Sequence, residues 1–314
     1  MISLSAFCYD IFFSQGGKME FHTAIKAVGV GKKHNRELTR EEMQETMRMI
    51  LEQSVYPEQV SAFLLGWRVR EESTEEFRAV LDLFDNYIEK MPVENAIELG
   101  YPYDGKVDNP YLFPLVASFL KQSGLQLAVT GDRLQPSKMG TTVKEVCERI
   151  DLPVNCNYFD RARFFPQLSQ LTEIRNRLGL RTGLNTVEKL HNIPSAEYAL
   201  IGVFHKPFVK KYAAIFAGRY KRLVIVQGNE GTPEIYSKCK YWICENGEIS
   251  EHYINPANFG IGYEKSWKRI SLERSVEMLE NPSNELLELA KLNAAFYLFI
   301  AHRAESVEEG WGRL

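Results

Sequence analysis

Hydrophobic residues recur every three or four positions through roughly the first ninety residues, which is the spacing of amphipathic helices. The apolar faces include Met43 with Met47 and Phe63 with Trp67. Stop, start and capping signals mark the predicted helices at Gly29 and Gly31, Thr39 with Glu42, Pro57, and Ser73 with Glu76. This pattern predicts an all-helical subdomain that ends near residue 92.

Beyond residue 92 the pattern changes to short apolar runs separated by helical sequence. The runs lie at 96–99, 125–129, 198–204 and 223–226, and helices are expected from about residues 110, 141 and 207. An Asn-Gly pair between 241–244 and 249–253 predicts a β-hairpin, and two helices at about 271–280 and 283–303 follow it. Because strands alternate with helices, we expect a large α/β domain with a mainly parallel sheet covered by helices.

Helical sequence at 168–193 interrupts this alternation, so we expect that segment to return to the small domain. The predicted boundaries are residues 19–92 with 168–196 for the small helical domain and 93–167 with 197–314 for the large α/β domain. Residues 1–18 are apolar but lack a basic n-region and a small-residue cleavage site, so they do not resemble a signal peptide. We expect them to be a non-native or disordered extension, with translation starting at Met19.

Composition narrows the class of protein. The chain has 314 residues, of which 45% are hydrophobic, and this is enough to bury a sizeable core. The formal net charge of −3 gives no global basic field, so any binding of nucleic acid must come from local patches. The five cysteines are odd in number and scattered, which predicts a reduced, cytoplasmic protein, and no apolar run reaches 18 residues.

A resemblance to a known family is carried by the stretch 174–203. Its order and spacing are similar to a signature of the anthranilate phosphoribosyltransferase family, in glycosyl transferase family 3, and the matching residues are Arg175, Leu178, Gly179, Arg181, Thr182, Asn185, Leu190, Asn192 and 200–203. The resemblance covers roughly residues 19–314. It implies a small helical domain and a large α/β domain with a cleft between them.

The loop after the first predicted strand departs from the family pattern. Where the family has a glycine-rich GTGGDG loop and Asn-x-Ser-Thr, which cradle a pyrophosphate, this chain keeps only Gly100, Asp104, Gly105 and Asn109. Tyr101, Pro102 and Tyr103 fill the loop, and Pro102 removes one N–H donor. We therefore expect a degraded donor loop that does not hold a pyrophosphate as the family does.

The second loop, 131–141, keeps more of the family pattern. Arg133, Ser137, Lys138 and Thr141 match or nearly match its basic and hydroxyl-bearing positions, and the loop enters a helix, which suits an anion. Asp132 replaces a residue that helps to seat anthranilate, and its carboxylate would repel that substrate. The family's anthranilate-contacting arginine is matched by Arg175, which is still present.

The third loop, 228–234, stands where the family has an acidic pair that binds a metal. Mg²⁺ bridging a pyrophosphate needs one or two positioned carboxylates. The resemblance places one of these carboxylates at Glu234, and Glu230 offers a second one that would approach the metal from a different direction. We expect a weakened Mg²⁺ site and predict no other cofactor.

Losses in three loops predict a member without tryptophan-pathway activity, because the reaction needs pyrophosphate to be bound and neutralised as it leaves. The runs 29–38 and 100–105 resemble a divergent branch whose members are dimers that bind nucleic acid without sequence preference. We expect a homodimer that binds single-stranded nucleic acid or another polyanion through basic loops around the cleft. The residues predicted to bind phosphate are Lys32, Lys33, His34, Arg36, Arg133, Ser137, Lys138, Thr141, Arg175 and Arg181.

Other readings of the same residues stay open. A phosphoribosyl- or glycosyltransferase with an altered acceptor would use a phosphoribosyl pyrophosphate-like donor and Mg²⁺. The cations at 32–36 can be a solvated helix connection, and Arg175, Arg177 and Arg181 can pair with acidic neighbours in a hinge. Tyr101, Tyr103 and Tyr111 can fill the loop or stack on bases. The basic surface at 206–222 is by default only a solvated helix face.

Overall fold

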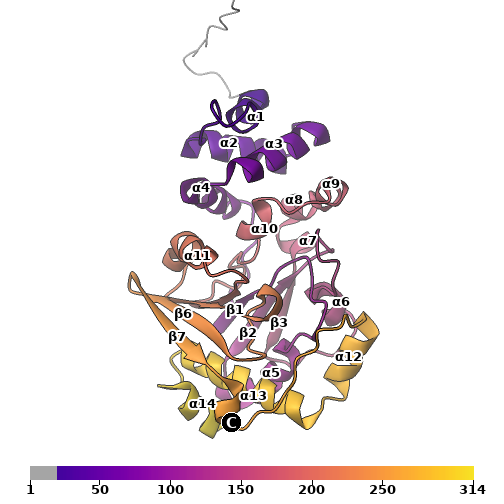
Figure 1. The fold of residues 1–314 in the computed structure, drawn as a ribbon, viewed down its shortest axis with the longest axis vertical. Helices are drawn as coiled ribbons and strands as arrows, with labels where there is room; N and C mark the ends of the chain where they lie inside the picture. The colour runs from indigo at the N-terminus through magenta and orange to yellow at the C-terminus, as the bar shows by residue number, and fades with distance from the viewer. Residues whose placement is uncertain (1–19) are drawn as a thin grey trace, which may run out of the picture.

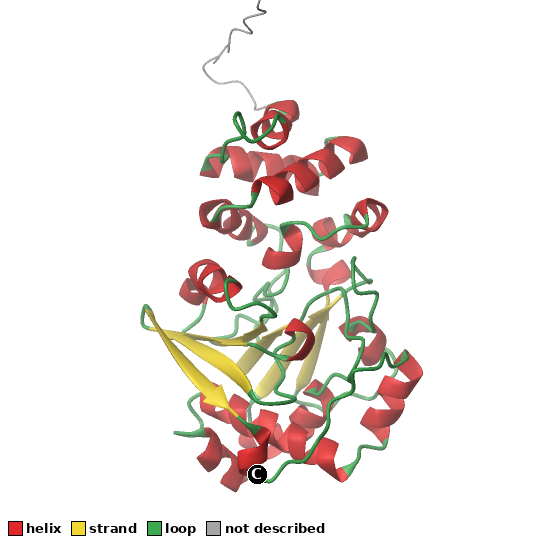
Figure 2. Cartoon of the chain, in the orientation of Figure 1, coloured by secondary structure: helices red, strands yellow, loops and turns green. Residues whose placement is uncertain are grey.

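The structure is a computed structural model that describes residues 20–314. The predicted extension, residues 1–18, and Met19 lie outside the described residues. Figure 1 and Figure 2 show a stack of helices at one end of an elongated molecule and a sheet flanked by helices at the other. The expected fold class, a helical domain followed by an α/β domain with a mostly parallel sheet, is confirmed.

Four helices form the bundle at the end of the chain shown in indigo. The predicted capping boxes are present at α2 and α4, where Thr39 pairs with Glu42 and Ser73 with Glu76, and Pro57 is the first residue of α3. These caps satisfy N–H groups that a helix start otherwise leaves unpaired. The helices are α1 (Phe21–Gly29), α2 (Arg40–Leu51), α3 (Pro57–Arg70) and α4 (Thr74–Phe84).

The apolar faces predicted for the bundle point into its core. Met43, Met47, Phe63 and Trp67 are each fully buried within the chain, so these faces are not available as the interface of the expected homodimer. Glu76 is buried beside them and accepts hydrogen bonds from the Trp67 indole at 3.0 Å and from two backbone N–H groups. A buried carboxylate with several donors fixes the packing of three elements, because leaving any of these groups unpaired costs free energy.

The sheet has seven strands in the order β3-β2-β1-β4-β5-β6-β7. The first five are parallel, and β5, β6 and β7 are antiparallel neighbours. The predicted hairpin is confirmed, and its turn residues Asn246 and Gly247 both have positive φ. The strands are β1 (Ala96–Gly100), β2 (Gln126–Gly131), β3 (Cys156–Asp160), β4 (Tyr198–Gly202), β5 (Arg222–Val226), β6 (Cys239–Glu245) and β7 (Glu248–Ile254).

Helices cover both faces of the sheet. One hydrophobic core runs from the bundle through α11 to one face, and a second core lies on the other face under α5 and α13. The covering helices are α5 (Phe113–Leu120), α6 (Val143–Cys147), α11 (Phe208–Phe216), α12 (Leu272–Glu280), α13 (Asn284–Ile300) and α14 (Val307–Arg313), with short 3₁₀ turns η1 (Lys121–Ser123), η2 (Ala217–Arg219), η3 (Asn229–Gly231) and η4 (Pro256–Phe259). Among the described residues, none of the helices has both the length and the apolar composition needed to span a membrane.

Strand β3 and helix α14 are among the elements that were not predicted. Strand β3 has polar residues at Asn157 and Asp160 and lies at the edge of the sheet, where one side of the strand needs no partner strand. Helix α14 contains Gly310 and Gly312, which lower helix propensity. Gly310 is required by packing, because a Cβ there would lie 2.7 Å from the Ala295 carbonyl oxygen of α13.

Four short helices leave the sheet after β3 and pack against the bundle. In Figure 1 they lie between the bundle and the sheet, with α9 against α3 and α10 against α4. They are α7 (Arg161–Phe164), α8 (Pro166–Ser169), α9 (Thr172–Leu178) and α10 (Leu184–Val187). This segment joins the two parts of the molecule, because its residues contact both the bundle and the loops of the sheet.

The contact between Gly183 and Trp67 gives a test of this packing. A Cβ at Gly183 would lie 2.5 Å from the Trp67 ring, which is buried and cannot move aside. We expect Gly183→Ala to lower the free energy of unfolding by about 1–3 kcal/mol, measured by urea denaturation. The matched control is Gly218→Ala, because no atom lies within 4 Å of its Cβ position. Equal stability of the two variants would contradict this packing.

Candidate functional site

A pocket of about 280 Å³ lies between the sheet and the bundle. It is formed where the loops after β1, β2, β4 and β5 meet the segment around α10, which is the carboxyl edge of the parallel strands, where α/β sheets bind ligands. Four cations line it, Arg68, Lys138, Arg181 and Lys189, together with two carboxylates, Asp104 and Glu230. The pocket therefore has a surplus of positive charge and is suited to an anion.

Asp104 is paired inside the protein. Its side chain is 3% exposed and forms an ion pair with Arg181 and another, at 3.4 Å, with Lys138. Lys138 also donates to the Glu230 carbonyl oxygen at 2.9 Å, and burial lowers the pKa of its ammonium group. Arg181 and Lys138, both predicted to bind phosphate, do line the pocket, but each already contacts a carboxylate there.

Gly105 and Gly140 lie where the backbones of the first two loops cross at contact distance. Lys106 N–H donates to the Thr141 carbonyl at 2.8 Å, and Thr141 N–H donates back to Lys106 at 2.7 Å. A Cβ at Gly105, whose φ is +80°, would lie 2.5 Å from the Gly140 carbonyl carbon. A Cβ at Gly140 would lie 2.4 Å from the Lys106 carbonyl oxygen. Side chains are excluded here by the neighbouring loop, so these glycines do not by themselves indicate a phosphate cradle.

Glu234, the predicted metal ligand, is fully buried and its oxygens have donors. The Lys106 ammonium forms an ion pair with it, and the Leu112 N–H, the Tyr101 hydroxyl and the Thr232 hydroxyl donate at 2.6, 2.9 and 3.1 Å. Lys106 is itself buried, lies 4.3 Å from the centre of the Tyr236 ring and donates to the Pro110 carbonyl. An internal cation thus balances the carboxylate.

The Glu230 carboxylate is also occupied inside the protein, in this case by backbone N–H groups. Its carboxylate accepts the N–H groups of Val107 and Asp108 at 2.6 and 3.1 Å, and its φ is +56°. Within residues 20–314, no group of three His, Cys, Asp or Glu side chains is arranged to hold a metal ion. The residues present therefore do not fit the Mg²⁺ site that the sequence suggested, because both candidate carboxylates have internal donors.

The loop tyrosines fill space inside the protein. Tyr101, Tyr103 and Tyr111 are all buried, and Tyr101 and Tyr111 meet edge to face with ring centres 5.0 Å apart. This confirms that they pack and contradicts their use as exposed stacking platforms. Burial raises the pKa of the Tyr103 hydroxyl, which has no hydrogen-bond partner, and the Arg161 guanidinium carbon lies 4.0 Å from its ring centre.

Arg175 lies in a buried network and not in the pocket. Its guanidinium is fully buried and makes two hydrogen bonds to Glu188, at 2.6 and 2.8 Å. Arg161 bridges Glu188 and Asp132, at 2.6 Å to each. The prediction that Arg175 binds phosphate is wrong for this structure, because the Glu188 carboxylate occupies its donors. Asp132 likewise faces Arg161 and Ser169, and does not line the pocket.

The remaining residues of the first two loops are placed as follows. Arg133 is exposed and donates to the Ser169 carbonyl at 2.9 Å, and Ser137 is exposed beside Lys138. The Thr141 carbonyl accepts the Tyr111 hydroxyl at 3.0 Å. Asn109 is buried and holds the segment around Ser266, with 3.2 and 3.0 Å hydrogen bonds to its backbone. Gly100 packs against Leu190 and Ile201, so none of these groups faces the pocket.

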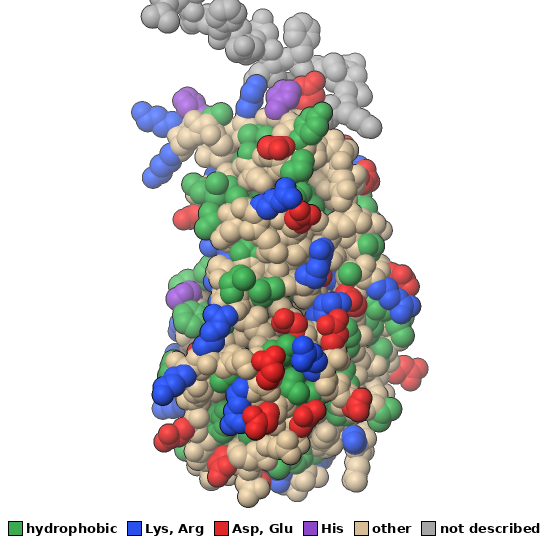
Figure 3. Space-filling model, turned by 90° about the vertical axis from the view of Figure 1, so that its right-hand side faces the viewer, with side chains coloured by type: hydrophobic (Ala, Val, Ile, Leu, Met, Phe, Trp, Pro, Cys, Tyr) green, Lys and Arg blue, Asp and Glu red, His purple; other side chains and the backbone are tan. Residues whose placement is uncertain are grey.

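The basic cluster at 32–36 is separate from the pocket. It follows α1 at the outer end of the bundle in Figure 1, and in Figure 3 Lys, Arg and His side chains project from that end of the molecule. Lys32, Lys33 and His34 are exposed. Arg36 makes a two-hydrogen-bond ion pair with Glu42, at 2.6 and 2.7 Å. The cluster at 32–36 therefore lies apart from the pocket that Lys138 and Arg181 line, and Arg36 is already neutralised.

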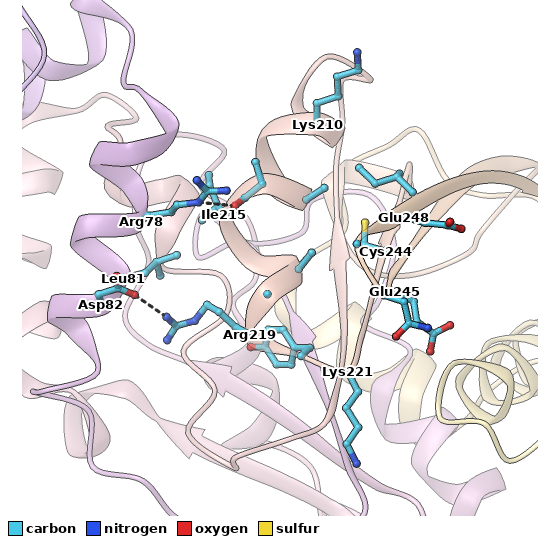
Figure 4. Close-up of a pocket in the computed structure, with 18 of the residues that line it drawn as sticks. Arg78, Leu81, Asp82, Lys210, Ile215, Arg219, Lys221, Cys244, Glu245 and Glu248 are labelled. Carbon is cyan, nitrogen blue, oxygen red and sulfur yellow. Dashed lines mark hydrogen bonds and ion pairs between the residues drawn. The ribbon is translucent and has the colours of Figure 1, made fainter. Parts of the chain in front are cut away.

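A larger hollow of about 730 Å³ lies between α4, α11 and the hairpin, but its cations are used structurally. Figure 4 shows Arg78 and Arg219 reaching between α4 and the segment around α11, while Lys210 points away. Arg78 donates to the Ala214 carbonyl at 2.9 Å and Arg219 pairs with Asp85 at 2.6 Å. The cations of 206–222 are therefore not simply a solvated helix face, because Lys206, Arg219 and Lys221 are in ion pairs and Arg222 is buried in β5 beside Glu245.

Several residues that shape the site were not found from the sequence. Arg68 and Lys189 line the pocket from the end of α3 and from the turn after α10, and Lys106, Arg161 and Glu188 supply the internal counter-ions. Their partners lie up to 128 positions away along the chain, so no local spacing links them. The one available signal was a lysine in the donor loop itself, directly after Gly105.

Comparison with known proteins gives matches to both parts of the chain. A family model described as the glycosyl transferase family α/β domain matches residues 137–314, and one described as the helical bundle domain of that family matches residues 23–84. A protein of Aquifex aeolicus named only as uncharacterized is 29% identical over 293 residues, covering 90% of this chain and 94% of that protein. Anthranilate phosphoribosyltransferase of Cupriavidus necator is 27% identical, covering 88% of each chain.

Solved structures show the same fold. Anthranilate phosphoribosyltransferase from Saccharomyces cerevisiae, in complex with PRPP and Mg, superposes with a TM-score of 0.74 at 14% identity and covers 93% of this chain and 91% of its own. The enzyme from Thermus thermophilus gives a TM-score of 0.69 at 18% identity, covering 93% and 92%. At these identities the similarity establishes the architecture alone.

The buried Glu188 gives a pH-dependent test. Burial acts to raise the pKa of its carboxyl, but pairing with Arg175 and Arg161 outweighs burial and leaves the pKa below its ordinary value of 4.5. A depressed carboxyl pKa stabilises the fold above the unfolded pKa, and this contribution is lost as pH falls through the folded pKa. We expect Glu188→Gln to cost about 3–5 kcal/mol at pH 7, because the buried Arg175 guanidinium loses its counter-charge and Arg161 keeps only Asp132.

The measurement is urea denaturation of both proteins between pH 3 and 7. The difference between wild type and Glu188→Gln is expected to be constant above pH 4.5 and to shrink below it. A difference that stays constant through pH 3 would contradict a depressed pKa for this carboxyl.

Proposed function

The chain belongs to the glycosyl transferase family whose helical bundle and α/β domains it contains, and from that premise we propose that it lacks tryptophan-pathway activity and binds nucleic acid or another polyanion. The observation that carries the proposal is the pairing of Lys106 with Glu234 beneath a pocket in which cations outnumber carboxylates.

Internal pairing argues against phosphoribosyl transfer. Departure of a pyrophosphate needs a metal or fixed cations that are free to take up its charge. Here the carboxylate that would hold the metal is saturated by Lys106 and three neutral donors, and Arg181 is committed to Asp104. A donor would have to displace these contacts before it could bind as a reactive complex.

The same internal pairing favours a ligand that is held by charge attraction alone, such as a polyanion. Asp104 and Glu230 offset two of the four cations that line the pocket, and Arg68 also pairs with Glu72 at 3.2 Å, which leaves a surplus of one cation. A phosphate backbone gains free energy at such a surface by releasing counterions and needs no specific geometry. Lys32 and Lys33 at the end of the bundle offer a second contact for a long strand. We therefore propose single-stranded nucleic acid as the partner.

The homodimer stays a prediction, and its interface must use residues other than those buried in the bundle core. Leu65 and Val69 are exposed on the outer side of α3, and Leu180, just beyond α9, is also exposed. We propose that a second copy covers this apolar stripe, because such side chains are otherwise left in water. Sedimentation velocity would give twice the monomer mass, and Val69→Asp would restore the monomer; a monomeric wild type contradicts the proposal.

Binding of a labelled single-stranded oligonucleotide, measured by anisotropy over a range of salt concentrations, tests the main proposal. We expect affinity to fall steeply with salt, and Lys32→Ala with Lys33→Ala to reduce the slope of log K against log salt by about 1.4, since each phosphate contact on a single strand contributes about 0.7. The matched control is Lys121→Ala, on η1 beside α5, at the far side of the sheet from the bundle. Absent or salt-independent binding by the wild type would refute polyanion binding.

The alternative is a phosphoribosyl- or glycosyltransferase with an altered acceptor, and the pocket at the carboxyl edge of the sheet favours it. An enzyme of this kind would be stabilised by its donor, because a ligand that binds only the native state raises the melting temperature. We expect phosphoribosyl pyrophosphate with Mg²⁺ to leave the melting temperature unchanged. A rise that depends on both components would favour the transferase.

A further inference from the structure

The chain between η4 and α12 crosses the first two loops as an extended strap, residues 261–271. The Asn109 side chain holds its middle through the Ser266 backbone and the Tyr263 hydroxyl, at 3.0–3.2 Å. The Ile270 N–H donates to the Val107 carbonyl at 2.8 Å, and the Arg269 guanidinium contacts the Met139 carbonyl. The strap is therefore fixed to both loops, and Figure 1 shows it passing beside α6.

One large aromatic side chain stands on this strap without a core to enter. Trp267 is 75% exposed, between Ser266 and Lys268. The Ser266 hydroxyl donates to the Lys268 carbonyl and accepts from the Lys268 N–H, each at 3.0 Å. A tryptophan offers a large apolar area, so leaving most of it in water is unfavourable for a side chain with only a structural role. The anchored turn holds its backbone in place.

The charge around Trp267 is positive. The Lys265 ammonium lies 4.1 Å from its ring centre, and Lys268 and Arg269 are both exposed beside it. Glu264 is the only acidic residue of 262–270, so this stretch by itself carries a surplus of two cations, and Asp108 of the neighbouring loop offsets part of it through Arg269. An aromatic face flanked by cations binds the stacked base and the adjacent phosphates of a single strand.

We propose that Trp267 is a stacking platform for an unpaired base, with Lys265, Lys268 and Arg269 neutralising the phosphates on either side. The inference rests on the proposed polyanion binding and makes it specific, because it requires a polyanion that carries bases. A membrane surface would need a broader apolar face than one ring, so nucleic acid fits the chemistry better.

Tyr253 provides a matched control elsewhere on the surface. It is 60% exposed, and the Lys240 ammonium lies 4.8 Å from its ring centre, which reproduces the aromatic-lysine arrangement. Lys240 and Lys206 both pair with Glu251, however, so no comparable surplus of cations surrounds this ring among the described residues. It lies on the edge strand β7 and not on the strap.

The experiment measures binding of a fluorescein-labelled oligothymidylate of about 20 nucleotides and of inorganic polyphosphate, a polyanion without bases. We expect Trp267→Ala to weaken oligonucleotide binding about tenfold, because stacking contributes about 1–3 kcal/mol per base and about 1.4 kcal/mol is a factor of ten. Trp267→Phe retains a ring and should lose about threefold or less. Tyr253→Ala should bind as the wild type does, and all variants should bind polyphosphate equally.

Each outcome decides between the two proposals. If the wild type binds both ligands and Trp267→Ala binds the oligonucleotide equally well, the stacking platform is wrong while polyanion binding stands. If Trp267→Ala weakens both ligands by the same factor, the residue acts without contacting bases and the platform is also wrong. If the wild type binds neither ligand, both proposals fail. Binding to anionic vesicles that depends on Trp267, without oligonucleotide binding, would assign the strap to membranes.

Discussion

A buried charge needs a counter-charge, and this constraint organises the region between the two domains. Arg161, Arg175, Glu188 and Asp132 are all fully or almost fully buried and neutralise one another at 2.6–2.8 Å. They come from the loop after β2 and from the helices and turns between β3 and β4, so their pairing fixes how the loops of the sheet meet the helical segment. Arg175, which the family resemblance assigned to a ligand, is thus used here to hold these two parts of the chain together.

Carboxylates in the loops after β1 and β5 are also neutralised by cations of the protein itself. Lys106 balances Glu234, and Arg181 with Lys138 balances Asp104. In each case a side chain of the protein occupies the charge that a metal or a substrate would satisfy. Once these pairs are made, the cations that line the pocket still outnumber its carboxylates, and this excess is the feature on which the proposed polyanion binding rests.

The sequence predicted the fold well, because the information it needed was local. Capping boxes, the Asn-Gly turn and the apolar periodicity each lie within a few residues and were confirmed, whereas β3 and α14 were missed because an edge strand tolerates polar residues and because packing retains Gly310 inside a helix. The site depended on contacts between distant segments. Arg175 looked like a binding residue by position, and only the structure shows Glu188 against it, 13 residues further along.

Gly105 and Gly140 indicate a shared fold and do not by themselves indicate a shared activity. Two chain segments cross there at contact distance, so the fold requires these glycines whether or not the loop binds a phosphate. A glycine pattern in this loop thus records the ancestry of the scaffold. The residue that follows Gly105 is more informative about the site, because the Lys106 ammonium supplies Glu234 with a cation from within the protein.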